Sequence, residues 1–194
     1  MATVKAKDVL TTGEVAKICN VAPRTVSKWF DSGALSGYRI PGSKDRRIPL
    51  NQLIRFMKLH GMPLDGLMTG ATRVMIVDDE HEIVDVIEKI LEDEAKYEVE
   101  VAKNGFQAGV IAERFRPHVI LVDLHLKDID PREIIAMVKR SSDLQLTKVI
   151  ALSGKYTEAE AKGLTALGYD GFLKKPFHVR QVIQTIEEAT NPVY

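Results

Sequence analysis

Several short apolar runs in the second half of the chain end in side chains that can do chemistry. In chain order these ends carry Asp78, Asp79 and Glu80, then Asp123, then Ser153, and finally Lys174 and Lys175. Carboxylates that are brought together raise one another's pKa unless a cation neutralises them. Carboxylate oxygens with few nitrogen or sulfur ligands nearby favour Mg²⁺, which often also bridges to a phosphate. The residue types therefore indicate a magnesium-binding acidic site.

The remaining residues at these ends make the predicted site reactive. A carboxylate can attack phosphorus and form an aspartyl phosphate, while Mg²⁺ and a lysine ammonium neutralise the oxygens of the transferred group. Lys175 has the position for that ammonium, and the Ser153 hydroxyl can donate to a phosphoryl oxygen. Taken singly, each of these residues is as well explained as a solvated loop residue. Their occurrence together, each at the end of an apolar run, favours a site that accepts a phosphoryl group.

Strands and helices that alternate along residues 73–194 would bring these ends together. The expected strands are Val74–Val77, Glu98–Ala102, Val119–Val122, Lys148–Leu152 and Gly171–Leu173. The expected helices are His81–Asp93, Gly105–Arg116, Pro131–Arg140, Glu158–Leu167 and Val179–Ala189. Near-continuous runs of Val, Ile and Leu flanked by helices predict a five-stranded parallel sheet covered on both faces, a doubly wound α/β domain. Ligands of such sheets bind outside the carboxyl ends of the strands, where the polar residues lie.

Residues 1–62 show a different pattern, that of a small helical domain with a hairpin. A Thr followed three residues later by a Glu forms a capping box, which begins a helix, and a proline suits the first position of a second helix. The predicted elements are a first helix beginning at Thr11, a second from Pro23 to about Gly33, a hairpin around Pro41–Asp45 and a third helix from Pro49 to Gly61. This is the outline of a winged helix-turn-helix.

A stretch with three glycines, Gly61–Thr72, separates the two patterns, and we place a linker at residues 63–72. The chain has no net charge, but residues 1–72 contain eleven Lys and Arg against five Asp and Glu, whereas residues 73–194 contain sixteen against twenty-two. A basic module suits a polyanion such as nucleic acid, and an acidic module suits a divalent cation. The charge distribution thus predicts different partners for the two parts.

The composition favours a soluble protein of a reducing compartment. A lone cysteine, Cys19, cannot form an intramolecular disulfide, and no cluster of thiols and histidines has zinc-site spacing. The first ten residues lack the apolar core of a signal peptide, and no run of about eighteen apolar residues could span a membrane. We therefore expect a cytoplasmic protein with no membrane partner.

The strand ends of residues 73–194 resemble those of the receiver domains of two-component response regulators. The resemblance rests on the motifs VDDE, VILVDL, ALSG and FLKKPF and extends from about Arg73 to Ala189. It implies the strand order 2-1-3-4-5, phosphorylation of Asp123, Mg²⁺ as the cofactor, and a cis peptide bond between Lys175 and Pro176. It assigns roles to Asp78, Asp79, Asp123 and the main-chain carbonyl of His125 as metal ligands, to Ser153 and Phe172 as switch residues, and to Lys175 as the phosphate-contacting lysine. Lys175 is chosen over Lys174 because the family's lysine directly precedes the proline.

The segment after Asp123 departs from the family pattern. The family usually has a methionine-proline turn and an Asp-Gly there, whereas this chain has LHLKDIDP, with Lys127 where proline is common. The pair Asp130-Pro131 still suits a helix start, through side-chain capping and a fixed φ. His125 and Lys155 lie at positions that vary in the family beside the phosphate, where a side chain could tune hydrolysis. We expect both to be ordinary surface residues.

Residues 10–59 are similar to the helix-turn-helix domains of MerR-like, excisionase-type and BldC-type regulators. The similarity rests on the apolar pattern, on Trp29 followed by a loop with glycine, and on the pair Arg46-Arg47. It implies that the outward residues of the second helix approach the major groove of double-stranded DNA and that wing residues hold phosphates. The residues of the first group are Arg24, Thr25, Ser27 and Lys28, and those of the second are Arg39, Lys44, Arg46 and Arg47. Trp29 and Phe30 are expected in the core. The alternative is a small helical interaction domain whose basic surface is simply solvated.

Together these features predict a transcription regulator of a two-component system. It would take a phosphoryl group from a sensor histidine kinase, or from a phosphotransfer protein, onto Asp123 and then change its DNA binding or its self-association, for example as a homodimer through the receiver domain. One alternative is a Mg²⁺-dependent phosphotransferase on the same scaffold, and another is an interaction module that does not touch DNA. The chain has no insertion that would cover a substrate, so we expect it not to be an enzyme.

Overall fold

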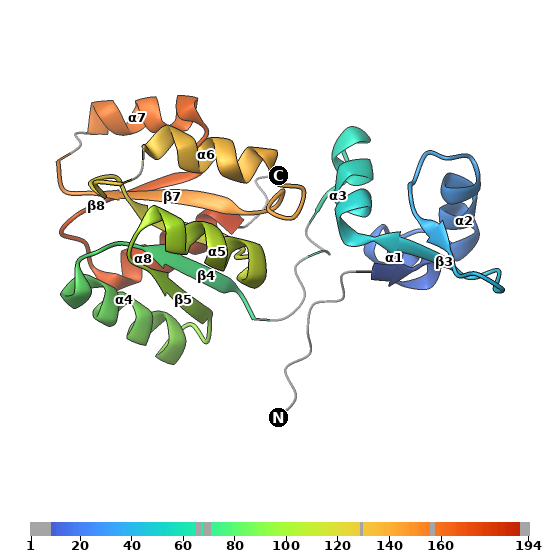
Figure 1. The fold of residues 1–194 in the computed structure, drawn as a ribbon, viewed down its shortest axis with the longest axis horizontal. Helices are drawn as coiled ribbons and strands as arrows, with labels where there is room; N and C mark the ends of the chain where they lie inside the picture. The colour runs from blue at the N-terminus through green and yellow to red at the C-terminus, as the bar shows by residue number, and fades with distance from the viewer. Residues whose placement is uncertain (1–8, 65–66, 68–70, 129, 156–157, 191–194) are drawn as a thin grey trace. The chain divides into compact units, whose positions relative to one another are not determined.

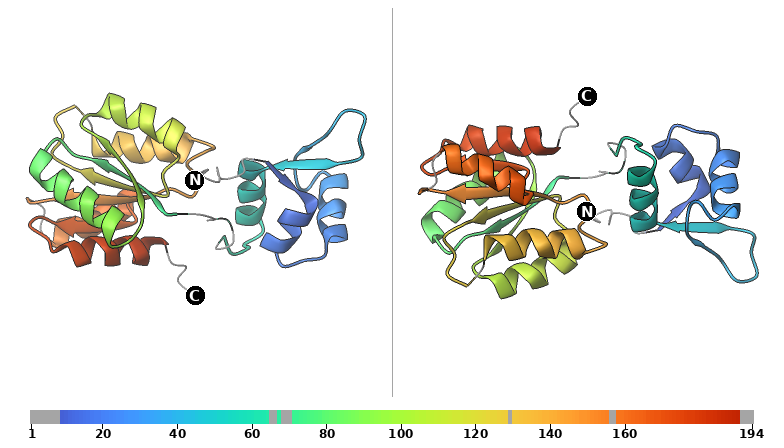
Figure 2. Two further views of the ribbon diagram at one scale, coloured as in Figure 1. Left: turned by 90° about the horizontal axis from the view of Figure 1, so that it is seen from below. Right: turned by 90° about the horizontal axis from the view of Figure 1, so that it is seen from above.

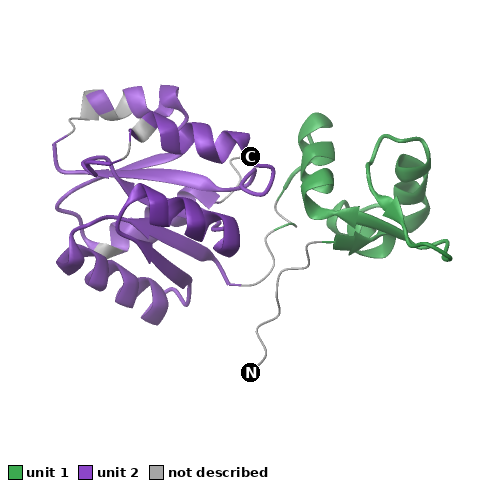
Figure 3. Ribbon diagram, viewed as in Figure 1, with its two compact units in different colours: residues 1–70 green, residues 71–194 purple. Residues whose placement is uncertain are grey.

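The structure is a computed structural model of the chain, and it describes residues 9–64, 67, 71–128, 130–155 and 158–190. The chain divides into two compact units, residues 1–70 and residues 71–194 (Figure 3). Part of the expected linker, residues 65, 66 and 68–70, lies outside the described residues. Within the described ranges, no helix is both long enough and apolar enough to cross a membrane. Each unit has a sheet of its own.

Residues 71–194 form a five-stranded parallel sheet with helices on both faces (Figures 1 and 2). The strands are β4 (Arg73–Val77), β5 (Glu98–Ala102), β6 (Val119–Asp123), β7 (Lys148–Ser153) and β8 (Gly171–Lys174). The helices are α4 (His81–Asp93), α5 (Gly105–Phe115), α6 (Pro131–Arg140), α7 (Glu158–Leu167) and α8 (Val179–Thr190). All neighbouring strands are parallel and follow the order β5-β4-β6-β7-β8, which confirms the predicted doubly wound sheet and the order 2-1-3-4-5.

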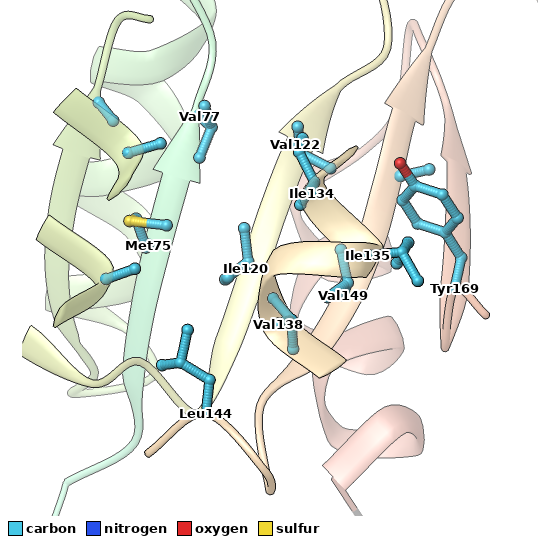
Figure 4. Packing of buried hydrophobic residues seen from close by; sticks show 14 of the residues in the cluster. Met75, Val77, Ile120, Val122, Ile134, Ile135, Val138, Leu144, Val149 and Tyr169 are labelled. Atoms are coloured by element: carbon cyan, nitrogen blue, oxygen red, sulfur yellow. The ribbon is translucent and has the colours of Figure 1, made fainter. Parts of the chain in front are cut away.

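Alternate residues of the strands face two separate apolar cores. From β6, Ile120 and Val122 pack with residues of α5, α6 and α7, whereas Val119 and Leu121 pack with residues of α4 and α8. Figure 4 shows the first core, in which side chains of α6 lie against those of β6 and β7. Burial on both faces explains why the strands are continuously apolar rather than alternating. Because burying each Val, Ile or Leu stabilises by roughly 1.5–3 kcal/mol, the strands give the polar residues at their ends a rigid support.

The N-terminal unit is a helix-turn-helix joined to a small antiparallel sheet. Its helices are α1 (Thr12–Ile18), α2 (Pro23–Asp31) and α3 (Leu50–Leu59), and its strands are β1 (Val9–Thr11), β2 (Tyr38–Arg39) and β3 (Arg46–Pro49). The sheet order is β1-β3-β2, so the predicted hairpin of β2 and β3 is present. Trp29 packs against Phe56 of α3, with ring centroids 4.9 Å apart, but Trp29 and Phe30 are both half-buried, so neither lies in the fully buried core where the sequence analysis expects them.

Two features of this unit differ from the sequence prediction. Strand β1 is not predicted, because three residues are too few for a periodic signal and the partner strand β3 is remote in sequence. The third helix begins at Leu50 rather than at Pro49, because Pro49 is the last residue of β3 and pairs with Val9. The central strand of the sheet thus continues directly into the helix.

The predicted capping box at the start of α1 is formed in full. Thr11 Oγ1 accepts a hydrogen bond from the Glu14 amide at 3.2 Å, and Glu14 Oε2 accepts one from the Thr11 amide at 2.7 Å. These contacts satisfy amide groups near the helix start that have no acceptor within the helix. Thr11 thereby joins β1 to α1.

The substitution Thr11→Ala is expected to lower the free energy of unfolding of the N-terminal unit by about 1 kcal/mol, because it removes the side-chain acceptor of the Glu14 amide. Trp29 is the single tryptophan of the chain, so its fluorescence during urea unfolding reports this unit alone. Thr11→Ser keeps the hydroxyl and should unfold as the wild type does. Equal stability of the alanine variant and the wild type would contradict the contribution of the cap.

Candidate functional site

The carboxyl ends of four strands meet at one edge of the five-stranded sheet. Asp123, the last residue of β6, lies beside the residue that precedes Ser153 in β7. Lys175 follows the residue of β8 that pairs with Ser153. Asp78 directly follows Val77, the last residue of β4, and Val77 pairs with Val122, which precedes Asp123. The parallel register therefore brings an acid from each of two strands, a hydroxyl and a lysine to the same edge.

The Lys175 ammonium connects the carboxylates at this edge. Its Nζ donates to Asp78 Oδ2 at 2.8 Å, to Glu80 Oε1 at 2.9 Å and to Asp123 Oδ2 at 3.0 Å. One oxygen from each of these carboxylates lies within 4.8 Å of the others, and we call the three residues the carboxylate triad. The side chains of Asp78, Asp123 and Lys175 are 0%, 3% and 11% exposed. Three carboxylates around one ammonium leave an excess of negative charge, which solvent screens poorly at the two buried aspartates but reaches at Glu80, whose side chain is 54% exposed.

The pKa values of Asp78, Asp123 and Lys175 follow from their burial and from the hydrogen bonds between them. Burial raises the pKa of Asp78, despite the hydrogen bond from Lys175. Burial also acts to raise the pKa of Asp123, but the hydrogen bonds from Lys175 and from the His125 amide outweigh it and lower that pKa. Burial disfavours the Lys175 ammonium, yet the hydrogen bonds to the three carboxylates raise its pKa. Lys175 is therefore a permanent cation, and Asp123 is ionised at neutral pH.

Backbone amides orient the two buried aspartates. Asp78 Oδ1 accepts from the Glu80 amide at 2.9 Å, and Asp123 Oδ1 accepts from the His125 amide at 3.0 Å. The ring Nδ1 of His125 lies 3.2 Å from the same oxygen of Asp123, so the expectation that His125 is an ordinary surface residue is wrong. Each aspartate thus gives one oxygen to the loop that follows its strand and the other to Lys175. This arrangement fixes both carboxylates at the sheet edge.

The structure brings Asp78, Glu80, Asp123 and Lys175 together at the edge where the sequence analysis expects them, although the family resemblance gives Glu80 no role. Asp79, to which the family resemblance gives a role in metal binding, is exposed and is not a member of the triad found among the described residues. Glu80 lies three residues beyond Val77, the last residue of β4, and nothing in the sequence pattern indicates that its side chain contacts Lys175. The hydrogen bond from Lys175 to Glu80 is thus a contact that sequence reasoning misses.

The other predicted residues of this edge have distinct surroundings. Ser153 is buried, and its Oγ accepts from the Lys155 amide at 3.2 Å. Phe172 is half-buried against the core that contains α5 and α6, whereas Lys174 is exposed. The peptide bond between Lys175 and Pro176 is cis, which confirms the implication of the family resemblance. The half-buried position of Phe172 leaves its ring between the core and the surface.

The segment after Asp123 is anchored although its sequence departs from the family pattern. Asp130 Oδ1 accepts from the Arg132 amide at 2.7 Å and caps α6, as predicted. Asp128 Oδ2 accepts from the Gly105 amide at 2.7 Å at the start of α5. Lys127 is exposed. Two aspartates therefore tie this loop to neighbouring helices.

The predicted DNA-contacting residues of the N-terminal unit lie on α2 and on the hairpin. The exposed ones are Arg24, Lys28, Arg39 and Lys44, and the half-buried ones are Thr25, Ser27, Arg46 and Arg47. Asp31, the last residue of α2, accepts hydrogen bonds from both Arg39 and Arg46. No local pattern predicts this contact, because the arginines lie eight and fifteen residues further along the chain.

Family models match both units. The response regulator receiver domain matches residues 74–187, and a helix-turn-helix domain matches residues 9–58. The transcriptional regulatory protein TrcR of Mycobacterium tuberculosis is 30% identical over 149 residues, which are 77% of this chain and 53% of that protein. The chain therefore aligns with about half the length of this curated relative.

Solved structures match the unit that contains the carboxylate triad. The chemotaxis response regulator CheY4 of Vibrio cholerae is 28% identical with a TM-score of 0.57, and the match covers 62% of this chain and 99% of that one. The signal receiver domain of a DNA binding response regulator protein (merR) from Colwellia psychrerythraea is 25% identical with a TM-score of 0.55, over 60% of this chain and 96% of that one. Both matches support the receiver fold of this unit.

Removal of the Lys175 ammonium should expose how strongly the triad depends on it. The substitution Lys175→Met is expected to lower the free energy of unfolding of residues 71–194 by about 3 kcal/mol at pH 7 without added divalent ions, because it leaves buried carboxylates without their cation. A carboxyl group whose pKa is lowered on folding, as in Asp123, contributes stability above its ordinary pKa and loses it as the pH falls. The difference in stability between the variant and the wild type should therefore shrink as the pH falls toward the ordinary carboxyl pKa of about 4.

The measurement is urea unfolding followed by circular dichroism from pH 7 down to the acid range. Trp29 fluorescence serves as the internal control, because the N-terminal unit should be unaffected. If the free energy of unfolding of Lys175→Met stays below that of the wild type by the same amount at every pH, Lys175 stabilises the fold through packing rather than through its charge.

Proposed function

Because this chain belongs to the response regulator receiver domain family, we propose that it accepts a phosphoryl group on Asp123 and regulates transcription through DNA binding by its N-terminal unit. The observation that supports this most is the placement of Asp123, buried and ionised, within hydrogen-bonding distance of Lys175. A sensor histidine kinase or a phosphotransfer protein is the proposed donor. The phosphoryl group then acts as a signal on the N-terminal unit.

In the transfer, a carboxylate oxygen of Asp123 attacks the phosphorus of a phosphohistidine. A phosphorus–oxygen bond forms as the phosphorus–nitrogen bond breaks, and the released imidazole nitrogen takes a proton from solvent. Lys175 exchanges its hydrogen bond to Asp123 for one to a phosphoryl oxygen. The Ser153 hydroxyl donates to another oxygen of the same group. The chain thus supplies the nucleophile and two of the donors that neutralise the new charge.

The donor set at this edge fits Mg²⁺. It consists of carboxylate oxygens, which hard divalent cations prefer, and the triad carries more negative charge than Lys175 balances. We propose Asp78, Asp79, Asp123 and the main-chain carbonyl of His125 as the metal ligands. When bound, the ion would lower the charge repulsion between the Asp123 carboxylate and the incoming phosphoryl oxygens.

Phosphorylation is proposed to select between two conformations of residues 71–194. A phosphoryl group can shift this equilibrium only by binding one conformation more favourably than the other. Ser153 distinguishes them because its buried hydroxyl can turn from the Lys155 amide toward a phosphoryl oxygen. The ring of Phe172 changes its position together with Ser153, since the core holds this ring only in part. These two residues are the proposed switch.

The N-terminal unit is proposed to bind double-stranded DNA. On α2, Arg24, Thr25, Ser27 and Lys28 approach base edges in the major groove, and the hairpin residues Arg39, Lys44, Arg46 and Arg47 contact phosphates. The fold supports this assignment, since α1, the turn and α2 are followed by the basic strands β2 and β3. The net positive charge of residues 1–72 supports it as well.

Incubation with acetyl phosphate and Mg²⁺ should add one phosphoryl group to the wild-type chain, detected by mass spectrometry of the intact protein. The substitution Asp123→Asn should abolish the adduct, because it removes the attacking oxygen. Asp85→Asn alters an exposed acid of α4 outside the triad and should leave the adduct unchanged. Hydroxylamine should release the group, since it cleaves acyl phosphates. An adduct that persists in Asp123→Asn would show that another residue is the acceptor.

Arg24→Ala is expected to weaken DNA binding by about 1–3 kcal/mol, because the lost side chain is proposed to contact base edges. The test uses DNA fragments that the wild type binds in a gel shift. Gel-shift titration measures the affinity. Arg55→Ala provides the matched control, because Arg55 is an exposed arginine of the same unit on α3, outside the proposed surface. If both variants bind DNA with the affinity of the wild type, the proposed DNA-binding surface of α2 is wrong.

A further inference from the structure

One carboxylate holds two arginines of the hairpin together at the end of α2. Arg46 Nε and Nη2 donate to Asp31 Oδ1 and Oδ2 at 3.1 and 2.7 Å, and Arg39 Nη2 donates to Asp31 Oδ1 at 2.8 Å. The contact of Arg46 is bidentate, which fixes the plane of its guanidinium group as well as its distance from α2. We call Arg39 and Arg46 the arginine pair.

The ring of Phe30 supports the arginine pair from a second side. The guanidinium carbons of Arg39 and Arg46 lie 5.7 and 5.8 Å from its centroid, within the range of cation–π attraction. Gly37 allows this approach, because a Cβ at that position would lie 2.8 Å from Phe30 Cε2 and closer still to the carbonyl oxygen of Arg47. The hairpin is therefore packed onto α2 rather than free of it.

The arginine pair keeps the capacity to bind an anion. One carboxylate balances only one of two positive charges, and a guanidinium group carries more N–H donors than its contact with Asp31 uses. The side chain of Arg39 is 47% exposed, so an incoming ligand can reach it. Without Asp31, the two guanidinium groups would repel each other at this separation. Asp31 thus allows both groups to lie at one place.

We propose that Asp31 is a positioning residue that, with Phe30, holds the arginine pair ready to bind one backbone phosphate of double-stranded DNA. This inference rests on the proposed DNA-binding function of the N-terminal unit. Asp31 acts through the two arginines and does not itself contact the DNA. The phosphate binds the N–H groups that Asp31 leaves available, while the carboxylate keeps the guanidinium groups in place.

The direction in which Asp31→Asn changes DNA affinity distinguishes a positioning role from simple repulsion between the Asp31 carboxylate and the DNA phosphates. The substitution removes a negative charge beside the proposed DNA surface, so electrostatics alone predicts tighter binding. A positioning role predicts weaker binding, because the amide cannot hold two guanidinium groups together. Asp45→Asn is the matched control: it removes the same charge from the hairpin that packs beside Asp31, where the Asp45 side chain is 65% exposed and its Oδ2 lies 3.8 Å from Arg47 Nη2.

The experiment measures binding of the full chain to a mixed-sequence DNA duplex by fluorescence anisotropy over a series of salt concentrations. A mixed sequence suffices, because phosphate contacts do not depend on sequence. Asp31→Asn should weaken binding about fivefold and reduce the slope of log affinity against log salt by about one. Asp45→Asn should bind as well as the wild type or more tightly.

The double variant tests whether Asp31 acts through the arginine pair. In the Arg46→Ala background, Asp31→Asn should weaken binding less than it does in the wild type, because one of the two arginines that Asp31 positions is gone. An equal loss in both backgrounds would overturn the positioning role, as would tighter binding by Asp31→Asn alone. Failure of the wild type itself to bind DNA at low salt would instead remove the proposed function on which the inference rests.

A further variant covers the case in which Asp31→Asn unfolds the N-terminal unit, as judged by Trp29 fluorescence. Arg46→Lys keeps the positive charge but cannot make the bidentate contact with Asp31. It should weaken DNA binding in the same way and also reduce the salt slope. Wild-type affinity and slope in Arg46→Lys would contradict the proposal.

Discussion

The structure depends on one electrostatic constraint, the gathering of buried carboxylates at the carboxyl edge of a parallel sheet. The apolar strands are fixed in register by their two cores, so Asp78 and Asp123 cannot move apart to reduce their repulsion. Lys175 meets this constraint by donating to both of them and to Glu80. Under the proposed function, the remaining negative charge favours a further cation and, through that cation, a phosphoryl group.

Each unit contains a cluster of charged side chains in which one sign of charge outnumbers the other. In residues 71–194 three carboxylates surround one ammonium, whereas at the end of α2 two guanidinium groups surround one carboxylate. In each cluster the single group of opposite charge, Lys175 or Asp31, holds the other groups in place. The excess charge of those other groups favours binding of a ligand of opposite sign. Under the proposed function, those ligands are a magnesium ion with a phosphoryl group in the first case and a DNA phosphate in the second.

The sequence predicts those features that arise from local patterns. Strands buried on both faces are apolar throughout, so their ends are visible, and Asp123 and Ser153 follow from them. Capping residues such as Thr11 and Asp130 predict where helices start, because their side chains bond to amides only two or three residues away. The contact of Asp31 with Arg46 spans fifteen residues and depends on how the hairpin packs, so no periodic signal marks it. The same is true of strand β1 and of the contact between Glu80 and Lys175.

Calorimetric titration of the full chain with Mg²⁺ tests the central claim most directly, because it asks whether the gathered carboxylates bind a cation in solution. The account predicts that the wild type binds Mg²⁺ and that Asp78→Asn, which removes one buried charge of the triad, weakens this binding by about tenfold or more. Equal affinity of the wild type and Asp78→Asn, or the absence of any binding heat in either, would contradict it.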